Sequence, residues 1–333
     1  MVATLRSWDR VHCSGFDEVL GPAVYRYFAT GYRRVEYVAV PRTLAGDLTC
    51  ISVQVTYPPD WSADSAGAVR TPHLSTIDAV VIACGVAEAV LTSVVNLDGE
   101  AVGSAYVADL DVRAGREAVD VASPIEVEVK AVATSPASSG RHRTTIAMSI
   151  GSFVAGISVV HDRPTEVSPL AHGLMRELTS GRVYGEHFRA ASHNAKVVQV
   201  TEHFTAVRCA LSVEPGPAVP APVGLSSHYW PSVTMVDSLV LAGQMAQLLL
   251  AKADPDLRRQ LGNLWMRRVT LELDVPEVAQ ANTELAELKL VASRDFTVNG
   301  RRLHSRTVES GSIFGMRIRA DLAYSVPVPV RSS

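Results

Sequence analysis

The chain has 333 residues, of which 47% are hydrophobic and 20% charged, with 31 Lys and Arg against 34 Asp and Glu. This length predicts two domains or one duplicated unit, and this composition supports a packed core and excludes general disorder. The balanced charge gives no sign of a nucleic-acid-binding surface, which requires clustered cationic residues.

Three features of the chain predict a cytoplasmic protein. The longest uncharged apolar stretch, residues 238–251, is shorter than the roughly 18 residues that a transmembrane helix needs. The N-terminal segment carries charges where a secretory signal would have an apolar run. The four cysteines form no C-x-x-C pair, which indicates neither a zinc site nor a disulfide framework. We therefore expect no membrane span, no metal and a reducing, cytoplasmic setting.

The chain contains an internal repeat with a spacing of about 160 residues. The segment Ser75–Ala83 (STIDAVVIA) matches Thr234–Ala242 (TMVDSLVLA), with hydroxyl on hydroxyl and aspartate on aspartate. A Gly-Ser pair that begins at Gly151 matches another that begins at Gly311. Nearly equal offsets at points so far apart indicate two homologous halves.

The repeat divides the chain into halves at 16–162 and 180–328, joined by a linker at 163–179. Each half shows the same order of predicted elements: two strands, a turn-rich loop, one helix and three long strand segments. In the first half these are 34–40, 49–57, loop 58–67, helix 78–91, 104–112, 125–133 and 144–160. In the second half they are 196–200, 206–213, loop 214–224, helix 237–250, 267–275, 284–294 and 308–326.

The apolar patterns of these elements predict how they pack. Both helices are apolar on nearly every side, so each must be surrounded by other elements. Strict alternation in Ile125–Lys130 predicts a strand with one face on a core and one in solvent. The chain is therefore predicted to be an α+β protein, in which each half wraps an antiparallel sheet around one long apolar helix.

This architecture resembles the hot-dog fold, duplicated in one chain as in double hot-dog enzymes. Four segments in the first half, Phe16–Pro22, Arg26–Phe28, Gly31–Arg33 and Pro72–Val80, resemble the avirulence protein D (AvrD) family. The A-factor-type butyrolactone synthases share a similar scaffold. The resemblance implies an enzyme that acts on an acyl thioester of coenzyme A or acyl carrier protein. The AvrD family is associated with acyl glycosides and lactones of the syringolide type, in which a 3-oxoacyl thioester is joined to a ketose such as xylulose.

The start of each predicted helix carries the candidate acid–base residues. His73 and Asp78 form a His-x-x-x-x-Asp string that resembles the helix start of polyketide dehydratase domains, and Asp237 is the counterpart of Asp78. A carboxylate and an imidazole beside a thioester carbonyl would serve as base and acid. Alternatively, Asp78 with Ser75 and Asp237 with Thr234 form capping boxes, whose carboxylates close the first turn. Backbone amides at such a helix start would hold the carbonyl oxygen.

The candidate substrate-binding residues lie in both halves, and each also has a structural alternative. His228, Tyr229 and Ser232 precede the second helix, where they contact substrate or pack the helix start. Arg26 and Arg33 bind phosphates or lie on the surface. Gln244 and Gln247 are the polar candidates inside the second helix, and Glu88 in the first helix is the counterpart of Gln247. Glu88 and Gln247 need hydrogen-bond partners if they are buried, and they face either the junction of the halves or the substrate.

Taken together, the residues and the resemblance predict an acyl-thioester-dependent transferase or condensing enzyme that joins a (3-oxo)acyl group to a small polyol or ketose in secondary metabolism. The alternatives are a hot-dog dehydratase or thioesterase, or a non-catalytic module that binds acyl groups or lactones. We expect no cofactor beyond acyl-CoA or acyl carrier protein as co-substrate. Acyl carrier protein and a second copy of the chain are candidate partners.

Overall fold

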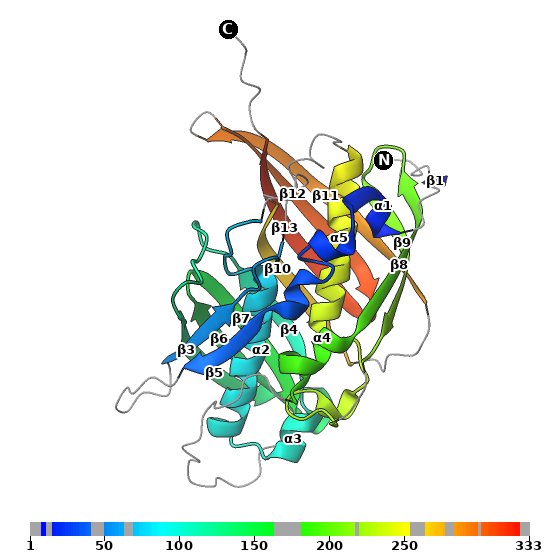
Figure 1. The fold of residues 1–333 in the computed structure, drawn as a ribbon. Helices are drawn as coiled ribbons and strands as arrows, with labels where there is room; N and C mark the ends of the chain where they lie inside the picture. Colours follow the sequence, from blue (N-terminus) through cyan, green and yellow to red (C-terminus); the bar gives the residue numbers. More distant parts are fainter. Residues whose placement is uncertain are drawn as a thin grey trace.

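The computed structural model describes residues 8–10, 15–40, 50–62, 69–162, 181–216, 220–253, 264–276, 283–298 and 301–326. The expected linker at 163–179 lies outside these ranges. The described residues form one antiparallel sheet with two long helices, α2 (Thr76–Ser93) and α5 (Met235–Ala253), packed against its concave face (Figure 1). Three short helices are also present: α1 (Phe16–Leu20), α3 (Gly99–Ser104) and α4 (Phe188–Ala190).

The sheet has the strand order β1-β8-β9-β11-β12-β13-β10-β4-β7-β6-β5-β3-β2. In the first half the strands are β2 (Glu36–Val40), β3 (Cys50–Thr56), β4 (Tyr106–Arg113), β5 (Ile125–Pro136), β6 (His142–Ile150) and β7 (Phe153–His161), preceded by β1 (Trp8–Arg10). In the second half they are β8 (Ser192–Thr201), β9 (Ala206–Glu214), β10 (Trp265–Leu273), β11 (Glu284–Val298), β12 (Arg301–Ile313) and β13 (Met316–Val326).

This order shows the duplication directly. Apart from β1, the strands of each half follow the same sequence from the outer edge to the centre, where β4 pairs antiparallel with β10. The pairing places Leu110 opposite Leu271, and the Arg268 guanidinium binds Asp111 across the seam at 2.7 Å. The two sheets are therefore continuous, and the α+β double hot-dog architecture expected from the sequence is confirmed.

The two long helices are buried because their sequences leave no polar face. In α2 the apolar positions from Ile77 to Leu91 are almost wholly enclosed, and α5 is enclosed in the same way from Met235 to Ala251. By length and hydropathy, Thr76–Ser93 is the one helix among the described residues that could cross a membrane, and 78% of it is buried inside the protein. On β5 the alternation predicted for Ile125–Lys130 places Ile125 and Val127 inside and their neighbours outside.

The strand segments predicted at 144–160 and 308–326 are both hairpins in the structure, which sequence alternation alone did not reveal. The first turns at Gly151, whose φ of +56° favours glycine. The second turns at Phe314 and Gly315, both with positive φ, so the repeated Gly-Ser pair at Gly311 does not mark the turn of the second half.

The N-terminal segment of each half packs on the helix of the other half. Helix α1 and the residues after it lie on α5, where the Phe28 ring fits against Gly243 and leaves no room for a larger side chain. Conversely, a short π-helical segment, η4 (Val183–His187), contacts α2. This exchange places side chains from both halves around each helix start.

Gly31 tests the packing of this N-terminal segment. A β-carbon at Gly31 would overlap the backbone carbonyl oxygen of Trp61, whereas one at Gly99 in α3 would meet nothing within 4 Å. We expect Gly31→Ala to lower the free energy of unfolding by about 1–3 kcal/mol in denaturant titrations, the usual cost of overpacking. The matched change Gly99→Ala should leave it unchanged or slightly higher. Equal unfolding midpoints for the two variants would contradict this close packing.

Candidate active site at the start of helix α2

A cavity of about 770 Å³ opens at the start of α2. Its wall combines the segment from Leu20 to Phe28 and residues His73–Thr76 with Gln247 from α5 and residues Leu264–Arg267 at the start of β10. Thr76 joins the two halves here, because its hydroxyl donates to the Met266 carbonyl at 3.1 Å. The cavity is therefore built between the halves, at the start of α2.

Asp78 lies directly behind the cavity wall and is completely buried. Its carboxylate accepts the Tyr37 hydroxyl at 2.6 Å, the Tyr27 hydroxyl at 2.9 Å and the Ser75 backbone amide at 2.8 Å, and it also contacts the Tyr57 hydroxyl. Ser75 completes the capping box by accepting the Asp78 amide. The capping geometry is thus present, together with three tyrosine hydroxyls that sequence analysis did not foresee.

Burial and the Asp78 charge together raise the pKa of Tyr27, Tyr37 and Tyr57 well above the ordinary tyrosine value. All three phenols therefore stay protonated at neutral pH and act as donors to the carboxylate. Such a set of donors stabilises a buried negative charge that would otherwise be costly. Of the three, Tyr27 is the one that lines the cavity in the described part of the chain.

His73 lines the cavity while Asp78 does not, so the two predicted acid–base residues lie on different sides of the wall. The His73 ring stands edge-on to Trp61 with centroids 5.9 Å apart, and its Nδ1 lies 3.3 Å from the Thr71 carbonyl. The Tyr57 hydroxyl bridges them, since its oxygen lies 2.9 Å from the His73 carbonyl oxygen and also contacts Asp78.

Arg26 and Gln244, predicted separately as substrate contacts, touch one another. The Arg26 Nη1 donates to Gln244 Oε1 at 2.7 Å, and the guanidinium also pairs with Asp17. The Arg26 Nε atom is buried and has no hydrogen-bond partner in the described structure. Burial lowers the pKa of Arg26, and Asp17 opposes this shift. Arg33 is outside the cavity, with its Nε donating to the Tyr32 hydroxyl at 3.0 Å.

The wall of the cavity is cationic. It holds four arginines, and among the described residues its single acidic side chain is Glu117. The arginines are Arg26, Arg70, Arg116 and Arg267. Because guanidinium groups bind phosphate oxygens well, this composition favours an anionic ligand.

The start of α5 has the same capping box but different surroundings. Asp237 accepts the Thr234 backbone amide at 2.9 Å, and His193 Nε2 lies 2.7 Å from its carboxylate. Tyr184 is buried, and burial raises the pKa of its hydroxyl, a shift that the Met235 backbone in the first turn of the helix opposes. A protein side chain therefore lies at this helix start.

The counterparts Glu88 and Gln247 have also diverged. Gln247 lines the cavity, whereas Glu88 forms an ion pair with Arg182 and accepts the Leu225 backbone amide at 3.0 Å. A side chain at Gly224 would overlap the Glu88 carboxylate, which fixes the second half closely against α2. Glu88 therefore faces the junction of the halves, and contact of Gln247 with a substrate stays a prediction.

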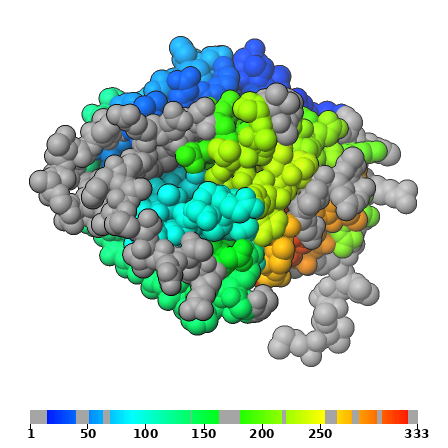
Figure 2. All heavy atoms as spheres, turned by 90° about the horizontal axis from the view of Figure 1, so that it is seen from below, coloured from blue at the N-terminus to red at the C-terminus, as the bar shows by residue number. Residues whose placement is uncertain are grey.

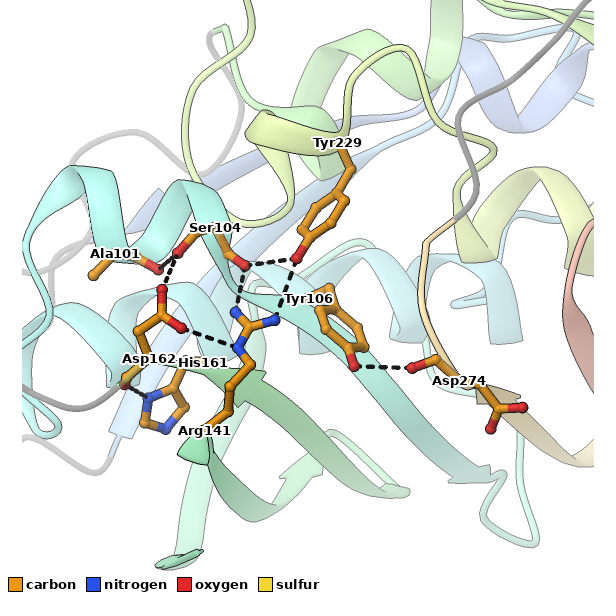
Figure 3. Close-up of polar contacts among 8 residues, drawn as sticks. All are labelled: Ala101, Ser104, Tyr106, Arg141, His161, Asp162, Tyr229 and Asp274. Atoms are coloured by element: carbon orange, nitrogen blue, oxygen red, sulfur yellow. Dashed lines mark hydrogen bonds and ion pairs between the residues drawn. The ribbon is translucent and has the colours of Figure 1, made fainter. Parts of the chain in front are cut away.

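Tyr229 joins the two halves at a place outside the cavity wall. Its hydroxyl donates to the Ser104 carbonyl at 3.0 Å, and Arg141 donates to the same carbonyl at 2.8 Å (Figure 3). Asp162 pairs with the Arg141 Nε at 3.0 Å. On the face seen in Figure 2, α3 and the segment before α5 lie side by side around this network.

The other two candidates before α5 are placed as follows. The His228 ring packs on Gly103, with Nε2 3.5 Å from the Glu100 carboxylate. Ser232 is buried. None of His228, Tyr229 and Ser232 belongs to the wall of the α2 cavity as described.

Comparison with protein families identifies the chain. The model of the Pseudomonas avirulence D protein (AvrD) matches residues 11–327. The chain belongs to the AvrD family. A search of the curated proteins found no match to the AvrD-family chain.

Solved structures similar to this AvrD-family chain include a tesB protein from Mycobacterium avium subsp. paratuberculosis, with 11% identity, a TM-score of 0.36 and coverage of 85% of this chain and 96% of that one. A 12:0-ACP thioesterase from Umbellularia californica has 9% identity and a TM-score of 0.37, with coverage of 79% and 94%. The dehydratase domain of the polyketide PpsC from Mycobacterium tuberculosis has 13% identity and a TM-score of 0.33, with coverage of 88% and 93%. At these scores no activity is transferred to the AvrD-family chain.

His161, beside the Arg141 network, predicts a pH effect on the stability of the AvrD-family chain. The ring is buried between the Thr144 hydroxyl at 2.8 Å and the Asp162 carbonyl at 2.6 Å, and burial lowers its pKa. Below about pH 6.5 the unfolded chain therefore binds more protons at this residue, and the folded state loses stability as the pH falls. We expect denaturant titrations at pH 7 and at pH 5 to show a smaller decrease in the free energy of unfolding for His161→Gln than for the unmodified chain.

The variant His203→Gln controls for the change in charge, because His203 is exposed in the turn between β8 and β9. The free energy of unfolding of His203→Gln should equal that of the unmodified chain at each pH. Parallel curves for His161→Gln and the unmodified chain would show that His161 does not contribute to the pH effect.

Proposed function

We propose that this AvrD-family chain is an acyl-thioester-dependent transferase or condensing enzyme, which joins a 3-oxoacyl group to a small polyol or ketose at the start of α2. The observation that carries the proposal is the set of unused amides there. The Asp78 amide is bonded to Ser75, but in the described part of the chain the amides of Thr76 and Ile77 have no hydrogen-bond partner. Thr76 borders the cavity. Free amides at a helix start stabilise an oxyanion.

The charge of the cavity supports a thioester whose carrier is phosphorylated. Coenzyme A and the phosphopantetheine arm of acyl carrier protein both present phosphate groups several bonds from the thioester. The exposed Arg116 and the half-buried Arg267 have no ion-pair partner among the described residues, so both remain able to bind such groups. A carrier bound in this way would direct its acyl group toward Thr76.

Burial argues against an acyl-cysteine intermediate at Cys84 and Cys209, the two cysteines whose side chains the structure describes. Cys84 on α2 is completely buried, and burial raises its pKa. Cys209 is equally buried, and its pKa is raised to about 12. Thiols in such surroundings are poor nucleophiles. In this proposal the attacking group is therefore a hydroxyl of the acceptor.

Turnover tests the proposal with two variants at one position. Thr76→Pro removes the Thr76 amide hydrogen, and proline is well tolerated in the first turn of a helix. Thr76→Ala removes the hydroxyl but keeps the amide. We expect the unmodified chain to release thiol from a 3-oxoacyl-CoA only when a ketose such as xylulose is present. Thr76→Ala should keep most of this activity, and Thr76→Pro should lose about 100-fold or more in kcat.

The other outcomes of this assay select the alternatives. Thiol release without the ketose would identify a thioesterase, and saturable binding with no release would identify a non-catalytic acyl-binding module. Equal activity of Thr76→Pro and Thr76→Ala, with ketose-dependent release intact, would contradict a role for the Thr76 amide.

A further inference from the structure

Asp78 has no direct route to a ligand. Its exposed fraction is 0%, and its carboxylate is surrounded by Ser75 and the three tyrosines. Two of these neighbours, Ser75 and Tyr27, also border the cavity. Any proton that Asp78 takes from a bound molecule must therefore pass through one of these two hydroxyl groups.

Tyr27 is the better route of the two. The Ser75 oxygen already accepts the Asp78 amide as the helix cap. The Tyr27 hydroxyl donates to Asp78 Oδ1 at 2.9 Å and lies 2.7 Å from the Ser75 oxygen. With its proton directed at Asp78, the phenol oxygen accepts the Ser75 hydroxyl and keeps one lone pair that can accept a hydrogen bond from a bound molecule. The high pKa of Tyr27 keeps the phenol protonated, so it does not act as a phenolate base.

We propose that Tyr27 is a catalytic residue that relays the proton of the attacking acceptor hydroxyl to Asp78. The proposal rests on the acyl transfer proposed above. Asp78 is then a positioning residue and proton reservoir that acts through Tyr27 and never touches the substrate.

The relay balances in both directions. As the acceptor oxygen bonds to the thioester carbon, its proton moves to the Tyr27 oxygen and the Tyr27 proton moves to Asp78. The electron pair of the carbonyl moves onto its oxygen, next to the amides of Thr76 and Ile77. When the carbonyl re-forms, the carbon–sulfur bond breaks and the departing thiolate takes a proton from Tyr27, which regains one from Asp78. The products are the ester and the free thiol, and Tyr27 and Asp78 return to their starting states.

Tyr37 provides a matched control. Its hydroxyl donates to the same Asp78 Oδ1 atom at 2.6 Å, but its side chain is 3% exposed and lies off the cavity wall. Tyr27→Phe and Tyr37→Phe therefore each remove one hydroxyl from the same carboxylate oxygen. Tyr57 is less suitable, because it also bonds to the His73 carbonyl.

The experiment measures kcat and KM for the ketose-dependent release of thiol from 3-oxoacyl-CoA, with thermal unfolding of each variant. We expect Tyr27→Phe to lose about 100-fold or more in kcat, in line with the loss of an acid–base group, with KM for the thioester within about twofold. Tyr37→Phe should keep kcat within about fivefold of the unmodified chain, although both variants lower the melting temperature because each removes a donor from a buried charge.

The remaining outcomes separate this inference from the proposed function. Ketose-dependent release with equal kcat losses in Tyr27→Phe and Tyr37→Phe, or with no loss in Tyr27→Phe, would contradict the relay and leave the transferase proposal standing. An unmodified chain that releases no thiol would contradict the transferase itself, and the relay with it.

Discussion

The structure depends on the enclosure of two helices that have no polar face. Such helices are stable in water only when protein covers every side, and the curved sheet and the exchanged N-terminal segments provide that cover. Because the sides of both helices are enclosed, the helix ends are the places where unpaired backbone amides and carbonyls can bind capping groups or ligands. Because the first amides of a helix have no partner within it, each helix start must be capped, bound or left open to a ligand.

The two helix starts meet this requirement in different ways. Both keep an aspartate that closes a capping box, so the local structure of the repeat is preserved. At α5 the buried Tyr184 side chain lies at the helix start, next to the Met235 backbone. At α2 the amides of Thr76 and Ile77 are unpartnered in the described chain, and Thr76 borders the cavity. Duplication followed by divergence accounts for a chain with two equivalent helices whose starts have different surroundings in the described residues.

The fold was predictable because its causes are local. Period-two alternation in Ile125–Lys130, all-apolar helices and the repeated hydroxyl-x-x-Asp signal each occupy a short stretch of sequence. The hairpins at Gly151 and at Phe314 were missed because a tight turn inside a continuous apolar pattern changes few residues. The site was less predictable, because its members come together only in three dimensions.

Asp78 illustrates that limit. Its capping role follows from Ser75 three residues earlier, but Tyr27, Tyr37 and Tyr57 reach it from separate segments with no common spacing. Arg26 and Gln244 were each identifiable as unusual polar residues, but their contact depends on the packing of the N-terminal segment on α5. The most direct test of the whole account is a crystal structure of the chain with a non-hydrolysable analogue of 3-oxoacyl-CoA in which a methylene group replaces the thioester sulfur and the acyl carbonyl is kept. We predict the acyl carbonyl oxygen within hydrogen-bond distance of the Thr76 amide, with Tyr27 facing the reacting carbon. An acyl group bound instead at the start of α5, with Tyr184 displaced, would contradict the account.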